Sequence, residues 1–350
     1  MSEWLARHHR LRGFLPILAA TLILLGLPSI VTGSFWQRVV VIALINVALA
    51  MSLNLVVGYT GLLALGHGAF FGIGAYTSAI LTTTHGWGFW SAFAVAGLAA
   101  GLCGAALAAI TLRLRGHYLA IATLGFAVIL YQVLMNWISV TRGPLGLPGI
   151  LPPPDIPLGG AAIDFSLTAA YIYLAGFFAL LSYVVLRRII RSPMGEALTA
   201  IREDEVSALS LGIRTVAWKS FAFTVAATIA GFTGALYAGY IGILEPSSFI
   251  LTVSFTILAM VIVGGAGTLL GPVVGALVLT IAPEALREVG PEYRLILYGF
   301  ALTLTVLFFP QGLVGIGTAF RSKVKSLGIG VPKADSSSRS MSEGVPDDAP

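Results

Sequence analysis

The sequence predicts an all-α integral membrane protein, a polytopic bundle of about ten transmembrane helices, some of them broken by glycine. Of its 350 residues, 57% are hydrophobic and only 10% are charged, and the mean hydropathy is +0.93. A soluble domain carries about a quarter charged residues, so this composition excludes one. Apolar stretches of roughly 17 to 25 residues, long enough to cross the hydrocarbon core as helices, recur from Phe14 to Phe309. The sequence lacks the ten-residue apolar/polar alternation that is typical of a membrane β-barrel.

Ten apolar segments are predicted as membrane helices. They cover residues 14–31, 37–57, 67–84, 89–112, 117–139, 165–186, 217–244, 251–264, 271–286 and 294–309. The first is too long for a signal-peptide core and lacks a small-x-small cleavage site, so we expect it to be retained. One membrane domain therefore spans residues 14–320, after an N-terminal segment (1–13). The polar tail (321–350) has too little apolar surface to fold and is expected to be disordered.

The distribution of positive charge predicts the orientation. With the amino terminus inside, 16 of the 20 Lys and Arg residues fall in inner segments and only four in outer ones. Cytoplasmic segments carry such an excess, so we expect both termini and the loop 187–219 in the cytoplasm, and the Gly- and Pro-rich loop 141–164 outside. We expect this outer loop to be ordered but not helical. The same bias accounts for the basic pI of 9.4 without nucleic-acid binding.

No cofactor or metal site is expected in the chain, and it is not predicted to be an enzyme. The lone Cys103 provides neither a disulfide nor a thiolate cluster. A phosphate loop of the G-x4-G-K-[S/T] kind is absent, so any ATP must be bound by another subunit. All 15 acidic residues lie in loops, tails or near span ends. Because ion-coupled transporters often hold ionisable groups inside the membrane, this disfavours a secondary transporter, although that alternative and a channel stay open.

Two glycine-rich segments, 53–76 and 264–275, interrupt the apolar runs. Broken helices in transporters expose carbonyls and helix ends to a substrate, whereas the alternative is that the glycines only allow close helix packing. His67 is likewise either a pathway residue or a structural hydrogen-bonding group. The candidate translocation path comprises Asn54, Tyr59, Thr60, Gly61, Gly66, His67, Gly68, Gly264, Gly265 and Gly267.

Small residues also recur every four positions in two predicted helices, which permits close helix–helix approach. These ladders are Ala96, Ala100, Gly104 and Ala108 in one helix, and Ala227, Gly231, Ala235 and Gly239 in the other.

The inner loop contains a predicted amphipathic helix that begins at Ser192-Pro193. Met194, Leu198, Ile201 and Ala208 fall near one face of this helix. Such a helix lies on the membrane surface or enters a groove on a partner. The acids from Glu203 to Glu205 disfavour anionic headgroups, so we favour the protein partner.

Four segments carry a resemblance to a known family. They are Gly58 to Tyr76 (GYTGLLALGHGAFFGIGAY), Leu112 to Leu124 (LRLRGHYLAIATL), Ser192 to Ile213, and Val263 to Ala276 (VGGAGTLLGPVVGA) with Pro310 to Leu313 (PQGL). Through them the chain, from about Val39 to Gly315, resembles the permease subunits of branched-chain amino acid ABC importers of the LivM type.

The resemblance implies the ABC importer permease fold in the bacterial inner membrane. It also implies several partners: a second homologous permease, two cytoplasmic ATP-binding subunits that hold ATP and magnesium, a periplasmic substrate-binding protein and membrane lipid. Permeases of urea or short-amide importers share these motifs and remain an alternative. The resemblance further implies that Ser192 to Ile213 docks on an ATPase, with the coupling residues Met194, Glu196, Leu198, Ile201, Arg202, Glu203, Glu205, Ala208 and Gly212.

Overall fold

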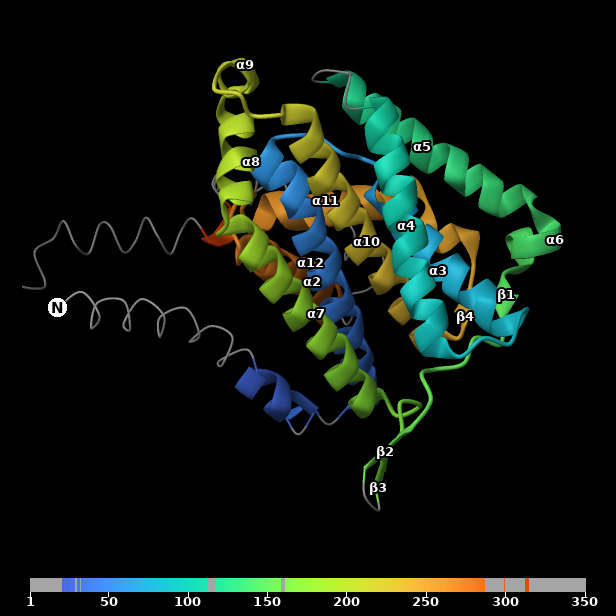
Figure 1. Cartoon of the computed structure of the whole chain (residues 1–350). Coiled ribbons are helices and arrows are strands. Elements are labelled where there is room, and N and C mark those ends of the chain that lie inside the picture. The colour runs from blue at the N-terminus through green and yellow to red at the C-terminus, as the bar shows by residue number, and fades with distance from the viewer. Residues whose placement is uncertain are drawn as a thin grey trace, which may run out of the picture.

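The chain forms a helical bundle in a computed structural model that describes residues 21–28, 30–31, 33–111, 117–158, 161–286, 299 and 312–314 (Figure 1). Residues 21–28 are helical. The helices that follow are α2 (Ser34–Thr60), α3 (His67–Thr83), α4 (Phe89–Thr111), α5 (His117–Asn136), α6 (Ile138–Thr141), α7 (Thr168–Ile190), α8 (Pro193–Glu203), α9 (Glu205–Ser210), α10 (Thr215–Ile241), α11 (Leu251–Gly264) and α12 (Gly271–Ala285). Two 3-10 turns, η1 (Gly143–Leu145) and η2 (Pro246–Phe249), lie between them.

Eight of the ten predicted membrane segments coincide with helices in the described part of the chain. Six spans in that part are long and apolar enough to cross a membrane, namely α2, α4, α5, α7, α10 and η2 with α11. The segments predicted at 67–84 and 271–286 are helices of 17 and 15 residues, α3 and α12, because glycine-rich loops occupy the chain before them. The number of about ten spans is therefore not confirmed. Segment 294–309, most of segment 14–31, and the segments 1–13 and 321–350 lie outside the described residues.

The two small-residue ladders pack against each other, which is the close helix–helix approach that their spacing permits. A Cβ on Gly231 of α10 would overlap Ala100 of α4, and one on Gly104 of α4 would overlap Ala227. On another side of α10, a Cβ on Gly74 of α3 would collide with the Gly231 backbone. Helices in lipid gain no hydrophobic free energy by associating with each other. Close backbone approach stabilises their association instead, because it maximises dispersion contacts. Glycine and alanine thus place α3 and α4 directly against α10.

Short strands lie at the end of the bundle opposite α8 and α9 (Figure 1). Strand β1 (Leu147–Pro148) pairs antiparallel with β4 (Ile243–Leu244), and β2 (Ile156–Leu158) pairs with β3 (Ala161–Ile163) in a hairpin. Among the described residues from 142 to 164 there is no α-helix, which agrees with the non-helical loop that the sequence predicts.

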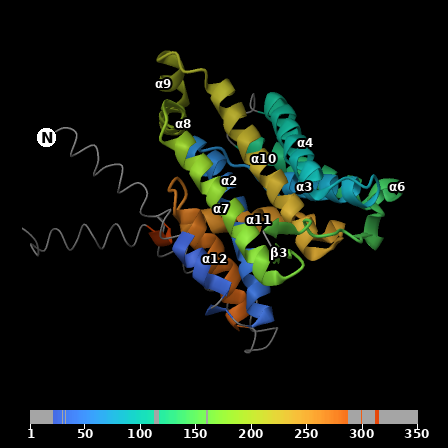
Figure 2. The ribbon, with the colours of Figure 1, turned by 60° about the horizontal axis from the view of Figure 1, so that its bottom comes forward.

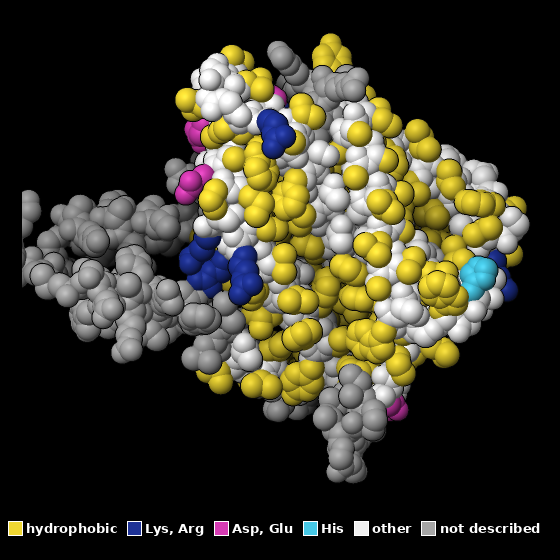
Figure 3. Space-filling model, viewed as in Figure 1, with side chains coloured by type: hydrophobic (Ala, Val, Ile, Leu, Met, Phe, Trp, Pro, Cys, Tyr) yellow, Lys and Arg dark blue, Asp and Glu magenta, His cyan; other side chains and the backbone are white. Residues whose placement is uncertain are grey.

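Charged side chains gather at the end that carries α8 and α9. Figure 2 shows α7 continuing into α8, with α9 at the extremity. Hydrophobic side chains cover most of the face in Figure 3, while Lys, Arg, Asp and Glu lie mainly near α8 and α9. The apolar belt is the surface expected beside lipid.

Candidate functional site

A buried asparagine holds the loop between α11 and α12 against α2. Asn54, only 3% exposed, accepts a hydrogen bond on Oδ1 from the Gly267 amide and donates from Nδ2 to Thr268 O, both at 2.9 Å. Thr268 Oγ1 in turn donates to Gly265 O (2.8 Å) and accepts from the amide of Gly271 (3.0 Å), where α12 begins. A side-chain amide offers both a donor and an acceptor, so one residue satisfies two main-chain groups. Asn54 therefore fixes this loop, called glycine loop 2 (residues 265–270).

Arg202 of α8 reaches the place where glycine loop 2 meets the end of α2. Its Nη1 donates to Gly58 O in the last turn of α2. A Cβ on Gly61 would stand 3.3 Å from its Cγ, and one on Gly267 would overlap Nη1. Gly61 and Gly267 have φ values of +71° and +79°, a left-handed conformation that favours glycine. Glycine at these positions leaves room for the arginine, and Gly61 opens glycine loop 1 (residues 61–66).

His67 forms a buried hydrogen bond at the start of α3. The Ser52 hydroxyl donates to Leu49 O (2.8 Å), so its oxygen accepts from Nε2 of His67, also at 2.8 Å. The His67 ring is 3% exposed and packs edge-on to Phe70. Of the two interpretations of His67, the geometry favours the structural hydrogen-bonding one.

The neighbours of His67 bind other helices. The Gly68 amide donates to Ser254 Oγ of α11 (2.9 Å), and the Leu65 amide donates to Thr123 Oγ1 of α5 (3.0 Å). A Cβ on Gly66 would overlap Thr123 O. The start of α3 is thus the point where α2, α5 and α11 converge.

Most of the predicted path residues therefore lie in two groups. Asn54, Gly61, Gly265 and Gly267 lie around glycine loop 2, where Gly312 also packs against the backbone of Gly264 and Gly265. Gly66, His67 and Gly68 lie with Ser52, Thr123 and Ser254. Tyr59 and Thr60 are buried in the last turn of α2, where the Thr60 hydroxyl donates to Val56 O of its own helix. Four residues that contact these groups were not predicted, although each carries a hydroxyl within an apolar run: Ser52, Thr123, Ser254 and Thr268.

The apolar face of the inner-loop helix is buried inside this chain. Leu198 and Ile201 of α8, and Ala208 of α9, are 0%, 3% and 2% exposed, and α8 packs against α2, α7 and α10. The expectation that this face, with the half-buried Met194, enters a groove on a partner is therefore wrong. The bundle itself supplies the groove, because α8 covers the converging ends of three longer helices.

The exposed side of the inner loop carries a different set of residues. Glu196, Arg202, Glu203 and Gly212 are exposed among the predicted coupling residues. Three apolar side chains also project into solvent around α9, and together they are called the apolar tip: Val206 (66% exposed), Leu209 (49%) and Leu211 (80%).

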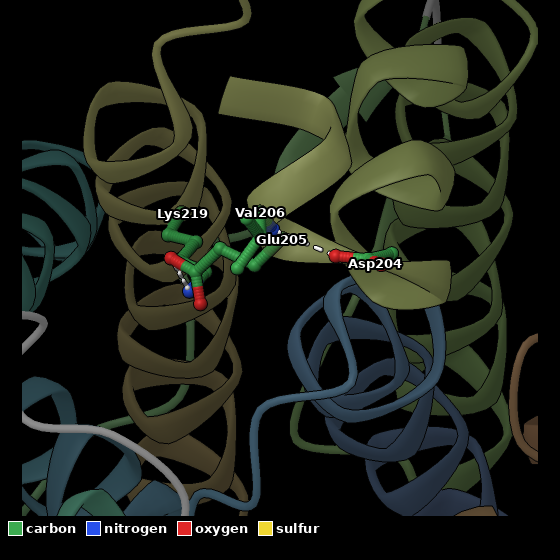
Figure 4. Close-up of polar contacts among 4 residues, drawn as sticks. All are labelled: Asp204, Glu205, Val206 and Lys219. Carbon is green, nitrogen blue, oxygen red and sulfur yellow. Dashed lines mark hydrogen bonds and ion pairs between the residues drawn. The ribbon is translucent and has the colours of Figure 1, made fainter. Parts of the chain in front are cut away.

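Two polar contacts fix α9 (Figure 4). Asp204 caps the helix, since its Oδ1 accepts hydrogen bonds from the amides of Val206 (2.8 Å) and Ser207 (3.0 Å). These bonds, with Ser207 first, lower the pKa of the Asp204 carboxyl. Glu205 Oε1 lies 2.6 Å from Nζ of the buried Lys219 in α10. The cap fixes the start of α9, and the ion pair attaches α9 to α10.

A cavity of about 400 Å³ separates α9 from the end of α2. Its walls are residues 60–63, residues 201–205 and Lys219. In the described residues, no group of three or more His, Cys, Asp or Glu side chains could hold a metal ion.

Comparisons with known proteins give consistent matches. The profile of the family described as branched-chain amino acid transport system / permease component matches residues 35–306. The high-affinity branched-chain amino acid transport system permease protein LivM of Escherichia coli K12 is 37% identical over 296 residues, which cover 78% of this chain and 68% of LivM. LivM of Salmonella typhimurium is also 37% identical, over 81% of this chain and 70% of its own length.

A second group of relatives is more distant. The permease protein LivH of Escherichia coli K12 is 27% identical over 281 residues, which cover 76% of this chain and 90% of LivH. No solved structure gives a significant match.

Proposed function

The chain belongs to the family of branched-chain amino acid transport system permease components, and we propose that it forms half of the translocation path of an ATP-driven importer of leucine, isoleucine and valine. The observation that carries this proposal is the 37% identity to two LivM permeases along most of the chain. The complex would lie in the bacterial inner membrane, with both termini of this subunit in the cytoplasm. LivH-like similarity in the same chain supports a homologous permease as its neighbour.

Conformational changes of the ATPase would be transmitted to this subunit through α8 and α9. A permease without an ATP site needs contact with an ATPase, and α9 stands beyond the bundle with three apolar side chains exposed to solvent. Exposed apolar groups rimmed by charge mark interaction sites. Here Glu203 and Asp204 provide the charged rim. We therefore assign the apolar tip, rather than the buried face of α8, to ATPase binding.

Substitution within the apolar tip tests this assignment. Leu211→Asp should lower the amount of ATPase that copurifies with the permease, because a charge replaces an apolar contact. The control is Ser210→Asp, which adds the same charge beside the tip without removing an apolar group. Leu102→Asp would not serve, because Leu102 lies in membrane helix α4. Equal copurification for Leu211→Asp and wild type contradicts the assignment.

The path would run beside the two glycine loops. They break α2–α3 and α11–α12 at the same end of the bundle, and Arg202 and Asn54 bring the loop backbones together. In transporters with broken helices, the N-terminal ends of the half-helices point at anionic groups of the substrate; here α3 and α12 begin directly after the two loops. Gly66, Gly68, Gly264 and Gly265 would border this route.

Uptake by the reconstituted complex tests the substrate class. The complex of this chain, its partner permease, the ATPases and the binding protein is placed in vesicles with radiolabelled leucine. Unlabelled isoleucine and valine should compete with leucine uptake, whereas urea and acetamide should not. Uptake of radiolabelled urea or acetamide, with no uptake of leucine, identifies the amide importer instead.

A further inference from the structure

We propose that Arg202 is the positioning residue that carries movement of α8 and α9 to the end of α2 and to glycine loop 2. This inference rests on the proposed function, because it names the link through which ATPase movement would reach the path. It differs from a docking role, since the guanidinium of Arg202 contacts this chain itself.

The end of α2 has a carbonyl that Arg202 satisfies. The last four carbonyls of a helix have no partner within the helix, and a positive charge beside them is favourable. Helix α2 has no basic residue in its own last turn. Arg202, 144 positions along the chain, supplies that charge through its hydrogen bond to Gly58 O.

The same guanidinium also lies against glycine loop 2. A Cβ on Gly267 would overlap Nη1 of Arg202, and one on Gly58 would overlap the Gly267 amide. Asn54 then ties the Gly267 amide to α2 at 2.9 Å. Arg202, Gly58, Gly267 and Asn54 thus form one continuous contact, called the α2 junction, between α8, the end of α2 and glycine loop 2.

The helix that bears Arg202 is fixed by contacts besides the α2 junction. Leu198 and Ile201 pack the opposite side of α8 into the bundle, and Glu205 binds Lys219 at 2.6 Å. The cavity of about 400 Å³ lies directly beside Arg202 and is bounded by the end of α2 and by α9. Movement of α9 can therefore open or close this space while Arg202 keeps α8 attached to α2.

A disulfide can replace the arginine contact. A Cβ on Gly61 would lie 3.8 Å from the Cβ of Arg202, which is within the range of about 3.5–4.5 Å for bridged cysteines. In a Cys103→Ala background, the double variant Gly61→Cys/Arg202→Cys lacks the arginine when reduced and joins the same two elements covalently when oxidised. Arg202→Gln removes the charge, and Arg191→Gln is the matched control, because Arg191 is exposed at the same end and none of the described hydrogen bonds or ion pairs involves its side chain.

The measurement is the number of substrate molecules imported per ATP hydrolysed by the reconstituted complex. Arg202→Gln should lower this ratio about three- to tenfold, as expected for loss of a partly exposed hydrogen bond from a charged group, while Arg191→Gln should keep the wild-type ratio. The double cysteine variant should show the low ratio when reduced and recover when oxidised. Recovery of the ratio on oxidation shows that the reduced variant lost the contact between α8 and the end of α2, and not its ability to fold.

Three results overturn the inference: a wild-type ratio for Arg202→Gln, failure of the cysteines to cross-link, or a cross-linked protein whose ratio stays low. Each is scored against a wild-type complex that imports leucine with ATP. A wild-type complex that imports nothing is the separate failure of the proposed function, and the inference falls with it.

Discussion

Replacing Asn54 by leucine should release glycine loop 2 from α2. The substitution keeps a side chain of similar size in a buried position but removes both hydrogen bonds to the loop, from the Gly267 amide and to Thr268 O. Each unsatisfied main-chain group costs about 1–3 kcal/mol. The loop is partly exposed, so water can replace each lost partner in part, and the lower limit of about 1 kcal/mol per group applies.

The expected total of about 2 kcal/mol corresponds to roughly 30-fold faster opening of the loop. Hydrogen exchange of the Gly267 amide, followed by mass spectrometry of the permease in detergent, measures this opening directly. Asn46→Leu is the matched control, because Asn46 also lies in α2 and its Nδ2 donates to Thr280 Oγ1 in α12, away from the loop (3.0 Å). Unchanged exchange at Gly267 in Asn54→Leu, or an equal increase in Asn46→Leu, would refute the role assigned to Asn54.

Three further predictions concern packing, pH and orientation. Gly231→Ala should destabilise the bundle by about 1–3 kcal/mol through overpacking. Gly125→Ala is the control and should be neutral or slightly stabilising, because Gly125 has open space around it. The unfolding temperatures of the two variants in detergent measure the difference. The pKa of Asp204 is lowered in the folded state. The stability that its cap gives to α9 is therefore fully present above the unfolded pKa of about 4. It is lost as the pH falls through the lower pKa of the folded protein. Accordingly, Asp204→Ala but not Asp204→Asn should speed exchange of the Ser207 amide at pH 7, and equal protection in both variants would contradict the cap. In a cysteine-free background, an impermeant thiol reagent on the periplasmic side should label Leu158→Cys and not Ser207→Cys; the opposite pattern reverses the orientation.

The membrane class and the helix–helix contacts could be predicted from the sequence because they depend on local patterns. The four-residue ladder through Ala100 predicted a close helix–helix approach, since small residues at that spacing occupy one helical face, and the structure shows that its partner is the ladder through Gly231. Glycine-rich segments also predicted where helices break. The bounds predicted for the two short helices, 67–84 and 271–286, match α3 and α12 to within one residue. Residue spacing alone did not predict the tertiary hydrogen bonds, such as those of Asn54, that hold the glycine loop between α11 and α12.

The orientation of α8 is the clearest case that sequence could not settle. Its amphipathic pattern predicted one helix with an apolar face that runs from Met194 to Ala208, but the structure ends α8 at Glu203 and places Ala208 in α9. The pattern also did not predict the surface that buries Leu198 and Ile201. An amphipathic pattern specifies that the apolar face of a helix must be covered, but it does not specify which surface covers it. For the same reason Arg202, which reads in sequence as one charge of a solvated face, binds Gly58 O, 144 positions away.

The most direct test of the central claim is the energy source for leucine uptake. Vesicles that contain the complete complex should accumulate leucine when ATP is supplied on the side of α9 and the binding protein on the side of the β2–β3 hairpin. Uptake should persist when ionophores abolish the proton and sodium gradients. Accumulation that continues without ATP or binding protein, but stops when those gradients are abolished, would contradict the account and identify the chain as an ion-coupled transporter.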